Sequence, residues 1–337
     1  MEQTLENYNP EFSPQKKSFA KRVLNTISSN YGWFFVLPAV ILMIVFTFYP
    51  IINSLILAFK DNYNALGGKF DGWGIENFQK VLTGNIAAAN FVDCLVNTLL
   101  FAVFSVPIST FLALIISVAL NSIKTLQKLY QTLFFLPYLT SALAMGAVFA
   151  SMFNVVEASA GKAETIGLFN NFLSWFGVSP VNWINVHALG QPFNPWAGRF
   201  VIILYSIWSG LPFKILILFS ALQGVNKQYY DAAKIDGASK SKTLWKVTVP
   251  LISPMISYLI VTGMIGGLKV YTSIVGIFGN NMGPNDDYEM GTAVGFIYAC
   301  IEKGTLGYAA AGSLILFAII MVFTGINMWV SKKKVHY

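Results

Sequence analysis

Two lysines lie inside long apolar runs, where a charged side chain is costly enough to indicate a function by itself. Lys269 stands deep within its run, so we expect it to need a wet cavity or a partner, with solute contact and a packing or gating role as equal alternatives. Tyr271 and Thr272 follow it, and an aromatic ring beside hydroxyl groups suits the apolar face and polar rim of a sugar. In membrane helices, however, Tyr and Thr more often serve packing.

The second lysine, Lys214, lies nearer the end of its run. It precedes Leu222 by eight residues, about 12 Å along a helix, so its long stem is expected to extend toward the water at that end. This favours a structural role. Trp208 and Phe213 flank Pro212 in the same run and are candidates to line a solute pathway, although such residues more often face lipid or the core.

No residue pattern indicates an enzyme. The Gly-x-x-x-x-Gly-Lys-Ser/Thr phosphate loop is missing, so we do not expect the chain to hydrolyse ATP. His187 and His336 are far apart in the sequence, and Cys94 and Cys300 lack the spacing of metal ligands. We therefore expect no catalytic site, no cofactor, no metal and two inert thiols.

A polar loop between two of the apolar runs has the pattern of a helix, a turn and a second helix. Asp231 suits a helix N-terminus, Ala232 and Ala233 are small helix formers, and Gly237 supplies the freedom for a sharp turn. Because Ala233 lies four residues before Gly237, one helix face is nearly free of side-chain bulk, and we expect another protein to approach it closely.

The same loop ends against the next apolar run. Val247 and Val249 offer apolar contacts, and Pro250 breaks the element just before that run begins. The loop is therefore expected to be rigidly tied to a membrane helix. A solvated basic loop that only enforces topology is the alternative interpretation.

The elements that must position these residues are membrane helices. Of the 337 residues, 55% are hydrophobic and 11% are charged, against about a quarter charged in soluble domains. Apolar runs of about 20 residues can cross the bilayer. We expect six spans, at 33–59, 95–120, 133–153, 200–222, 253–278 and 307–330. Small residues at four-residue spacing, Ala142, Gly146 and Ala150 in one span and Gly263 and Gly267 in another, predict close helix packing.

The basic residues indicate the orientation. Lys and Arg number fourteen in the segments on one side of the spans and six in those on the other, and basic residues accumulate in cytoplasmic segments. We therefore expect both termini and the 224–250 loop to be cytoplasmic. The external segments 60–92, 154–199 and 279–306 are long enough to dock another molecule, and 292–301 is expected to form a short helix. Because the positive charge lies between apolar spans, it does not indicate nucleic-acid binding.

The loop resembles a known family, the inner-membrane permeases of binding-protein-dependent ABC importers, and within it the maltose-permease-like carbohydrate branch. Their signature is Glu-Ala-Ala, three residues, Gly, nine residues and Ile-x-Leu-Pro. Here Asp231-Ala232-Ala233 is followed at the same spacing by Gly237 and by Val247-Thr248-Val249-Pro250. Shorter similarities support this: Gly74-Ile75-Glu76-Asn77-Phe78, Phe134-Phe135-Leu136-Pro137, Ile235-Asp236-Gly237-Ala238 and Met282-Gly283-Pro284.

The resemblance implies an all-α integral membrane protein of six transmembrane helices with the type I ABC importer permease fold. It implies a cytoplasmic N-terminal segment (1–32), a permease domain (33–330) whose loop 224–250 couples to the ATPase, and a basic tail (331–337). The expected partners are a second permease, two cytoplasmic ATPase subunits, an external solute-binding protein, the bacterial inner membrane and a carbohydrate solute.

Three other functions remain to be weighed. A permease of the same kind for a non-sugar solute is the serious alternative. An ion-coupled secondary transporter would use acids within the membrane, and none of the fifteen acids lies deep within an expected span. A membrane-embedded enzyme would need clustered His, Asp or Glu near a membrane face, and none appears.

Overall fold

The computed structural model describes residues 32–33, 35–65, 67–86, 89–123, 125, 127–156, 166–284 and 288–334. The chain divides into two compact units, Met1–Ser54 and Leu55–Tyr337. Nearly all of the expected N-terminal segment (1–32) lies outside the described residues, as do the last three residues of the expected basic tail.

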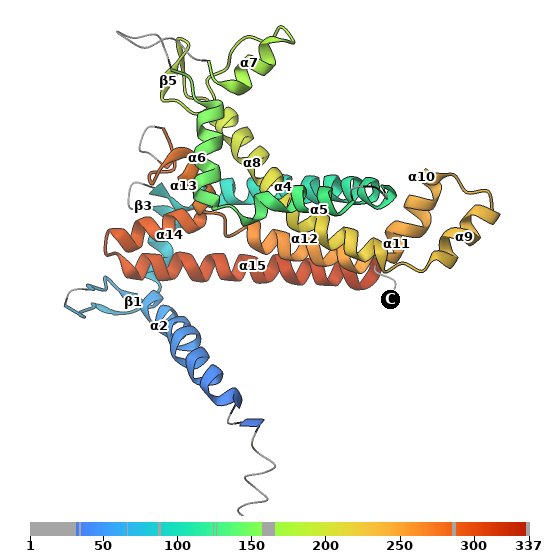
Figure 1. The fold of residues 1–337 in the computed structure, drawn as a ribbon. Helices are drawn as coiled ribbons and strands as arrows, with labels where there is room; N and C mark the ends of the chain where they lie inside the picture. The colour runs from blue at the N-terminus through green and yellow to red at the C-terminus, as the bar shows by residue number, and fades with distance from the viewer. Residues whose placement is uncertain are drawn as a thin grey trace, which may run out of the picture. The chain divides into compact units, whose positions relative to one another are not determined.

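Helices dominate both units (Figure 1). In chain order, the regular helical elements are η1 (Ile44–Phe48), α2 (Tyr49–Ala58), α3 (Glu76–Thr83), α4 (Phe91–Ser122), α5 (Gln127–Phe135), η2 (Leu136–Leu139), α6 (Ala142–Phe153), α7 (Leu168–Ser174), α8 (Pro195–Gln223), α9 (Lys227–Ile235), α10 (Lys240–Thr243), η3 (Leu244–Thr248), α11 (Val249–Leu251), α12 (Ser253–Gly267), α13 (Thr272–Phe278), α14 (Ala293–Glu302) and α15 (Leu306–Lys334).

Three short antiparallel hairpins join these helices in the second unit. They pair β1 (Lys60–Asp61) with β2 (Gly72–Trp73), β3 (Asn85–Ile86) with β4 (Ala89–Asn90), and β5 (His187–Ala188) with β6 (Gln191–Pro192). Each pairs only two residues per strand, so the hairpins serve as connections between helices.

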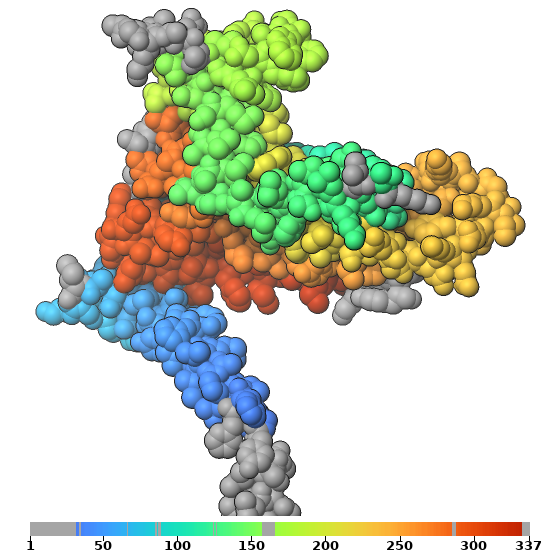
Figure 2. Space-filling view, in the orientation of Figure 1, coloured from blue at the N-terminus to red at the C-terminus, as the bar shows by residue number. Residues whose placement is uncertain are grey.

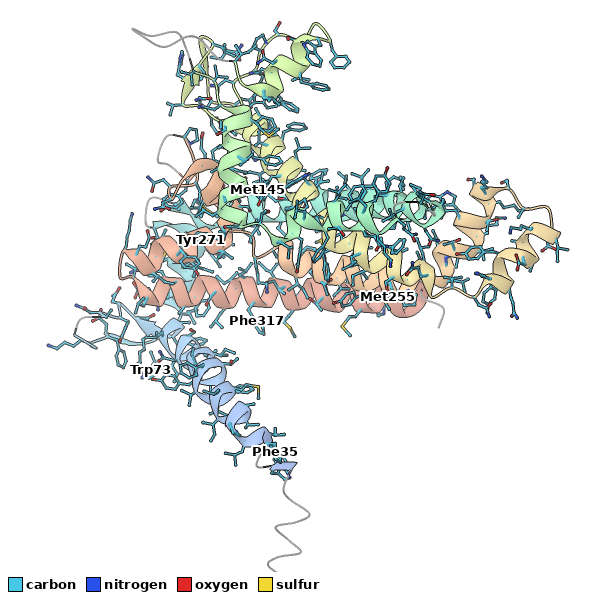
Figure 3. The ribbon with its side chains drawn as sticks, in the orientation of Figure 1. Phe35, Trp73, Met145, Met255, Tyr271 and Phe317 are labelled. Atoms are coloured by element: carbon cyan, nitrogen blue, oxygen red, sulfur yellow. The ribbon has the colours of Figure 1, made fainter. Side chains whose placement is uncertain are left out.

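The first unit contains most of one apolar helix, Phe35–Ala58, which is long enough to cross a membrane. Its side chains are exposed all round, as expected of a helix whose solvent is lipid. A π turn at η1 precedes Pro50, because proline has no N–H to donate and its ring crowds the carbonyl four residues earlier. Phe35, at the start of this helix, is labelled in Figure 3.

The second unit is built around α4. This helix packs against α8 along much of its length and against α12 and α14, while α15 runs beside α12 and α14. The outer surface of these helices carries large apolar side chains such as Phe317 and Met255 (Figure 3), which suit contact with lipid. Among the described residues, four helices are long and apolar enough to span a membrane. Two bent pairs, Gln127–Leu139 with Ala142–Phe153 and Lys240–Leu251 with Ser253–Gly267, bring the number to six when each pair is taken as one span. The prediction of six spans is confirmed in this form.

The first bent pair corrects an expected straight span. Gln127–Leu139 and Ala142–Phe153 meet at 95°, so the expected span 133–153 contains a sharp bend. Pro137 lies in the 3₁₀ turn at this bend, where the regular backbone ladder is interrupted.

The expected span 253–278 is wrong as a single helix. α12 ends at Gly267, the chain is irregular through Tyr271, and a separate helix, α13, follows. The break is held from outside, since the Thr292 hydroxyl donates to the Val270 carbonyl at 2.9 Å. α13 packs on α6 so closely that a Cβ added to Gly146 would lie 2.8 Å from the Gly276 Cα.

Candidate functional site

The loop between α8 and α12 begins with a helix, α9, whose two ends are closed by its own chain. The Asn226 side chain accepts a hydrogen bond from the Gln228 N–H at 3.0 Å. After the last turn, Gly237 has φ +67°, a left-handed conformation that glycine adopts without steric penalty. The Ala238 N–H then donates to the Ala233 carbonyl at 2.9 Å, the long bond of a Schellman cap. The helix therefore ends at a defined residue, and the chain turns sharply.

A continuous series of turns ties α9 to membrane helix α12. Ser239 caps α10, and the π turn η3 leads directly into α11, which contains Pro250. Thr248 is buried, and its hydroxyl lies 3.5 Å from the Tyr230 hydroxyl of α9. This segment then bends by 68° into α12. α9 is therefore joined to α12 through a continuous series of packed elements.

The surface of this loop differs in one respect from the expectation. Ala233 is only 7% exposed, so this residue does not lie on an open face of the helix. Ala232 is exposed. The loop instead presents large apolar side chains, with Ile235 87% exposed and Tyr229 and Trp245 about half exposed. Figure 2 shows this yellow and orange segment standing beyond the neighbouring helices of the second unit.

The other predicted loop residues support the element or lie on its surface. Val247 and Val249 are half-buried, consistent with apolar contacts before α12. Asp231 is exposed and lies 3.5 Å from the Lys234 ammonium, one turn further along α9.

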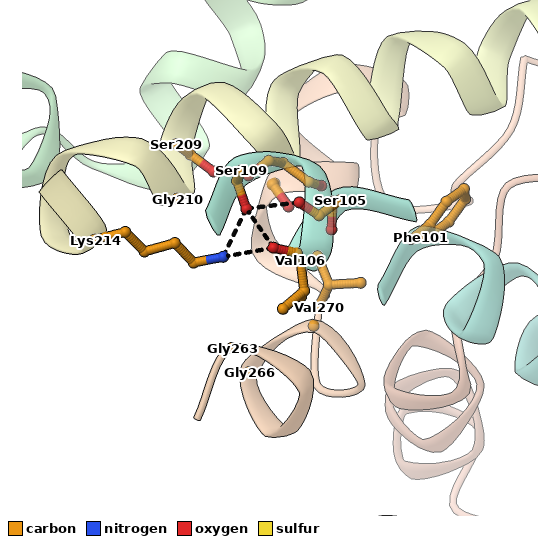
Figure 4. A pocket seen from close by; sticks show the side chains of 13 residues that line it. Phe101, Ser105, Val106, Ser109, Ser209, Gly210, Lys214, Gly263, Gly266 and Val270 are labelled. Atoms are coloured by element: carbon orange, nitrogen blue, oxygen red, sulfur yellow. Dashed lines mark hydrogen bonds between the residues drawn. The ribbon is translucent and has the colours of Figure 1, made fainter. Parts of the chain in front are cut away.

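A second site is a cavity of about 220 Å³ between α4, α8 and α12 (Figure 4). Its lining combines hydroxyl groups with backbone that carries no side chain. The hydroxyls come from Ser105, Ser109, Ser206, Ser209 and Ser273, and the bare backbone from Gly210, Gly263, Gly266 and Gly267. Phe101, Val106, Val270 and Lys214 complete the lining.

Lys214 is buried in this cavity at 6% exposure, and its ammonium has three partners on α4. It donates to the Ser109 hydroxyl at 2.6 Å, the Thr110 hydroxyl at 3.0 Å and the Val106 carbonyl at 3.1 Å. Figure 4 shows the side chain extending from α8 to this cluster. The expected extension toward the helix end is therefore wrong, because acceptors on the neighbouring helix are within reach.

Lys269, Tyr271 and Thr272 lie at the break between α12 and α13, outside the lining of the Lys214 cavity. Lys269 and Thr272 are exposed. Tyr271 stacks on Tyr298 of α14, with ring centroids 4.4 Å apart and planes 15° apart. Their part in solute contact stays a prediction.

Trp208 and Phe213 also lie outside the cavity lining, although both belong to α8. Trp208 packs in an aromatic cluster, 5.5 Å from the Phe149 ring. Phe213 stacks on Tyr138 at 5.8 Å. The Trp208 contact is core packing, whereas Tyr138 is 52% exposed. A pathway role for Trp208 and Phe213 likewise stays a prediction.

Sequence reasoning missed the cavity serines, although a signal was present. One face of the otherwise apolar α8 carries Ser206 and, three, four and eight residues later, Ser209, Gly210 and Lys214. Ser105 and Ser109 repeat this spacing on α4. Neither series indicates which helix packs beside it, so only the structure shows that the two faces meet.

No cluster of three or more His, Cys, Asp or Glu able to hold a metal exists among the residues that the structure describes. Cys94 and Cys300 are buried free thiols in the same apolar cluster, and burial raises the pKa of the Cys300 thiol, on the short helix α14, to about 11. A thiol with so high a pKa is a poor nucleophile near neutral pH.

Comparison with known proteins gives one family match and several relatives. The family described as "Binding-protein-dependent transport system inner membrane component" matches residues 80–336. The arabinooligosaccharides transport system permease protein AraP of Bacillus subtilis is 28% identical over 301 residues, covering 89% of this chain and 88% of AraP. The lactose transport system permease protein LacF of Rhizobium radiobacter is 29% identical, covering 90% of this chain and 94% of LacF.

A solved structure has the same fold. It is a chain of a bacterial alginate ABC transporter, crystallised in complex with an alginate pentasaccharide-bound periplasmic protein. The TM-score is 0.74 at 21% identity, and the match covers 94% of this chain and all of that one.

Proposed function

Because this chain belongs to the family of binding-protein-dependent transport system inner membrane components, we propose that it is one permease subunit of an ATP-driven importer for a carbohydrate. The names of two relatives, which refer to arabinooligosaccharides and lactose, support the choice of solute class. In this proposal the chain works with a second permease, two cytoplasmic ATPase subunits and an external solute-binding protein. ATP hydrolysis belongs to the ATPase partners.

The observation that carries the proposal is the construction of the 224–250 loop. α9 is capped at both ends, exposes apolar side chains to a partner, and is joined without a flexible linker to α12. We assign the coupling role to Asp231, Ala232, Ala233, Gly237, Val247, Val249 and Pro250. Nucleotide-driven movement of the ATPase would displace α9 and move α12 with it, a rigid-body switch.

The proposed solute pathway passes the Lys214 cavity. At about 220 Å³ it is smaller than the about 300–1,000 Å³ of pockets that enclose drug-sized ligands, so it accommodates one end of an oligosaccharide. The second permease would supply the opposite wall. ATP binding would open this pathway outward to receive the solute, and hydrolysis would reset it.

The proposed topology places both termini and the 224–250 loop in the cytoplasm of a bacterial cell. Its support is the excess of Lys and Arg in the segments of that side, fourteen against six. The domain limits follow from it, with a cytoplasmic segment at 1–32, the permease at 33–330 and a basic tail at 331–337.

The coupling role is tested in the assembled importer by ATP hydrolysis in the presence of the solute-loaded binding protein. Gly237 is the residue to change, since its φ is +67° and a Cβ there would meet no other atom within 4 Å. Gly237→Val strains the backbone, whereas Gly237→Asn is tolerated in this conformation. We expect Val to abolish the stimulation and Asn to retain most of it, with the complex assembled in both. Normal stimulation of an assembled Gly237→Val complex would refute the coupling assignment.

The solute class is tested separately. A thermal-shift screen of the copurifying binding protein against sugars, polyols and non-sugar solutes measures what is delivered to the permease. Stabilisation by a non-sugar solute alone would replace the carbohydrate assignment and leave the importer assignment intact.

A further inference from the structure

The charge of Lys214 has no counter-charge on the helices around it. The lining residues of its cavity include no Asp or Glu, and its three hydrogen-bond acceptors are neutral. α8, α12 and α13 contain no acid, and the acid of α4 is Asp93 in its first turn. Asp93 precedes Val106 by thirteen residues, about 20 Å along the helix. A protonated Lys214 therefore gives the cavity lining a net positive charge.

The neighbours of Lys214 do not depend on it for their own hydrogen bonds. The Ser109 hydroxyl donates to the Ser105 carbonyl at 2.6 Å, and the Thr110 hydroxyl donates to the Val106 carbonyl at 2.7 Å. Lys214 is therefore not needed to give these two hydroxyls an acceptor. What it adds is a cation in a low-dielectric site, where charge interactions are strong.

The space open to a ligand is the cavity of about 220 Å³ that Lys214 lines. Gly263 itself offers no further room, since a Cβ added there would lie 3.5 Å from the Lys214 Nζ and 2.9 Å from a Val106 methyl group. A Cβ added to Gly266 would meet no atom within 4 Å. A ligand group in this cavity would lie near the cation and the serine hydroxyls of α4 and α8 that share its lining.

We propose that this cavity binds an anionic group of the solute, a carboxylate or a phosphate, with Lys214 as the residue that selects it. The inference rests on the proposed function, since it assumes that the solute passes this cavity. It narrows the solute class to acidic sugars or sugar phosphates. The same charge would disfavour cations in the open pathway.

The test measures the electrostatic potential of the cavity in the assembled importer in lipid nanodiscs. Ser209→Cys places a thiol in the lining, while Cys94 and Cys300 are buried and contribute little background. The reaction rates of a negatively charged and a positively charged methanethiosulfonate reagent are compared, with and without ATP and vanadate. We expect Lys214 to favour the anionic reagent, and Lys214→Met to lower the anionic-to-cationic rate ratio about 10-fold.

Matched variants separate charge from shape. Lys214→Arg keeps the charge and should keep the ratio, whereas Lys303→Met removes an exposed lysine after α14 and should not change it. A ratio unaffected by Lys214→Met would overturn the proposal. A thiol that reacts with neither reagent in any nucleotide state would also overturn it, because a solute cavity must open to water.

Protection of the same thiol from reaction shows whether the anionic group is a carboxylate or a phosphate. Glucuronate, glucose 6-phosphate and glucose are added at equal concentration before the neutral reagent methyl methanethiosulfonate. Protection by glucuronate identifies a carboxylate, protection by glucose 6-phosphate a phosphate, and equal protection by glucose would overturn the proposal. ATP hydrolysis stimulated by the loaded binding protein is measured alongside, so that a failure of the proposed function is recognised separately.

Discussion

The 224–250 loop and the Lys214 cavity are held together in opposite ways. In the loop, the defining contacts join residues close in sequence, such as Ala233 with Ala238 and Tyr230 with Thr248. In the cavity, Lys214 binds residues that precede it by 104 to 108 positions. The loop is thus specified by local sequence, and the cavity by the packing of distant helices.

This difference predicts how each region responds to substitution. A change on the surface of the loop should affect coupling and leave the stability of the permease unchanged. A change that disturbs the helix contacts of the cavity wall should affect transport and stability together, because the same residues form both.

The largest effect is expected at the cavity wall. A Cβ at Gly263 would lie 2.9 Å from a Val106 methyl group, so Gly263→Val should overpack the α4–α12 contact and cost about 1–3 kcal/mol, with near-complete loss of transport. Gly266→Ala, where the added methyl group meets open space, is the matched control and should retain most transport. Thermal unfolding in nanodiscs and solute uptake measure the two effects. Equal behaviour of the two variants would contradict the cavity geometry.

These glycines also mark the limit of what the sequence predicts. The spacing of Gly146, Gly263 and Gly267 correctly indicated helix packing seams, and structure places Gly146 against Gly276. Six spans and the short helix α14 were likewise predictable from apolar runs. The break after Gly267 was not, because the apolar run resumes after Lys269 and reaches Phe278, and the bond that holds the break comes from Thr292.

The motif of the loop could be recognised from the sequence because the contacts that form it are local. Fixed spacing around Gly237 reflects a turn whose bonds lie within six residues. The partners of Lys214 were hidden because a charged side chain in an apolar run does not reveal which helix will pack beside it.

The next effect is expected on the loop surface. Ile235 is the most exposed of the large apolar side chains there, so Ile235→Glu should weaken docking of the ATPase by about 2 kcal/mol, about 30-fold, through loss of an apolar anchor. Gln228→Glu adds the same charge to an exposed polar position of α9 and should have a much smaller effect. Titration of the detergent-solubilised permease pair with ATPase measures the affinity. A change in permease unfolding temperature would show that the loop is not self-contained.

A smaller effect is expected from two substitutions that separate the charge of Lys214 from the volume of its side chain. Lys214→Met keeps the stem and leaves the hydroxyls of Ser109 and Thr110 bonded to their own helix, so the unfolding temperature should change little or rise. Lys214→Ala enlarges the cavity and should lower stability by about 2 kcal/mol. Thermal unfolding of the two variants gives the comparison. A large loss of stability in Lys214→Met would show that the charge stabilises the fold, which is the role that the sequence alone favoured.

The smallest effect on stability is expected at Asp231, although it begins the coupling motif. Its carboxylate lies 3.5 Å from the Lys234 ammonium, and both side chains are more than half exposed. Such a pair contributes about 0.5 kcal/mol or less, so Asp231→Asn should leave the unfolding temperature unchanged. Any loss of stimulated ATP hydrolysis in this variant would then come from a contact made to the partner. Asp231→Glu, which restores the longer acid, keeps the charge and should retain stimulation. A variant that lost stability instead would place Asp231 among the residues that fold the loop, and the division between a partner-facing surface and a self-contained interior would have to be redrawn.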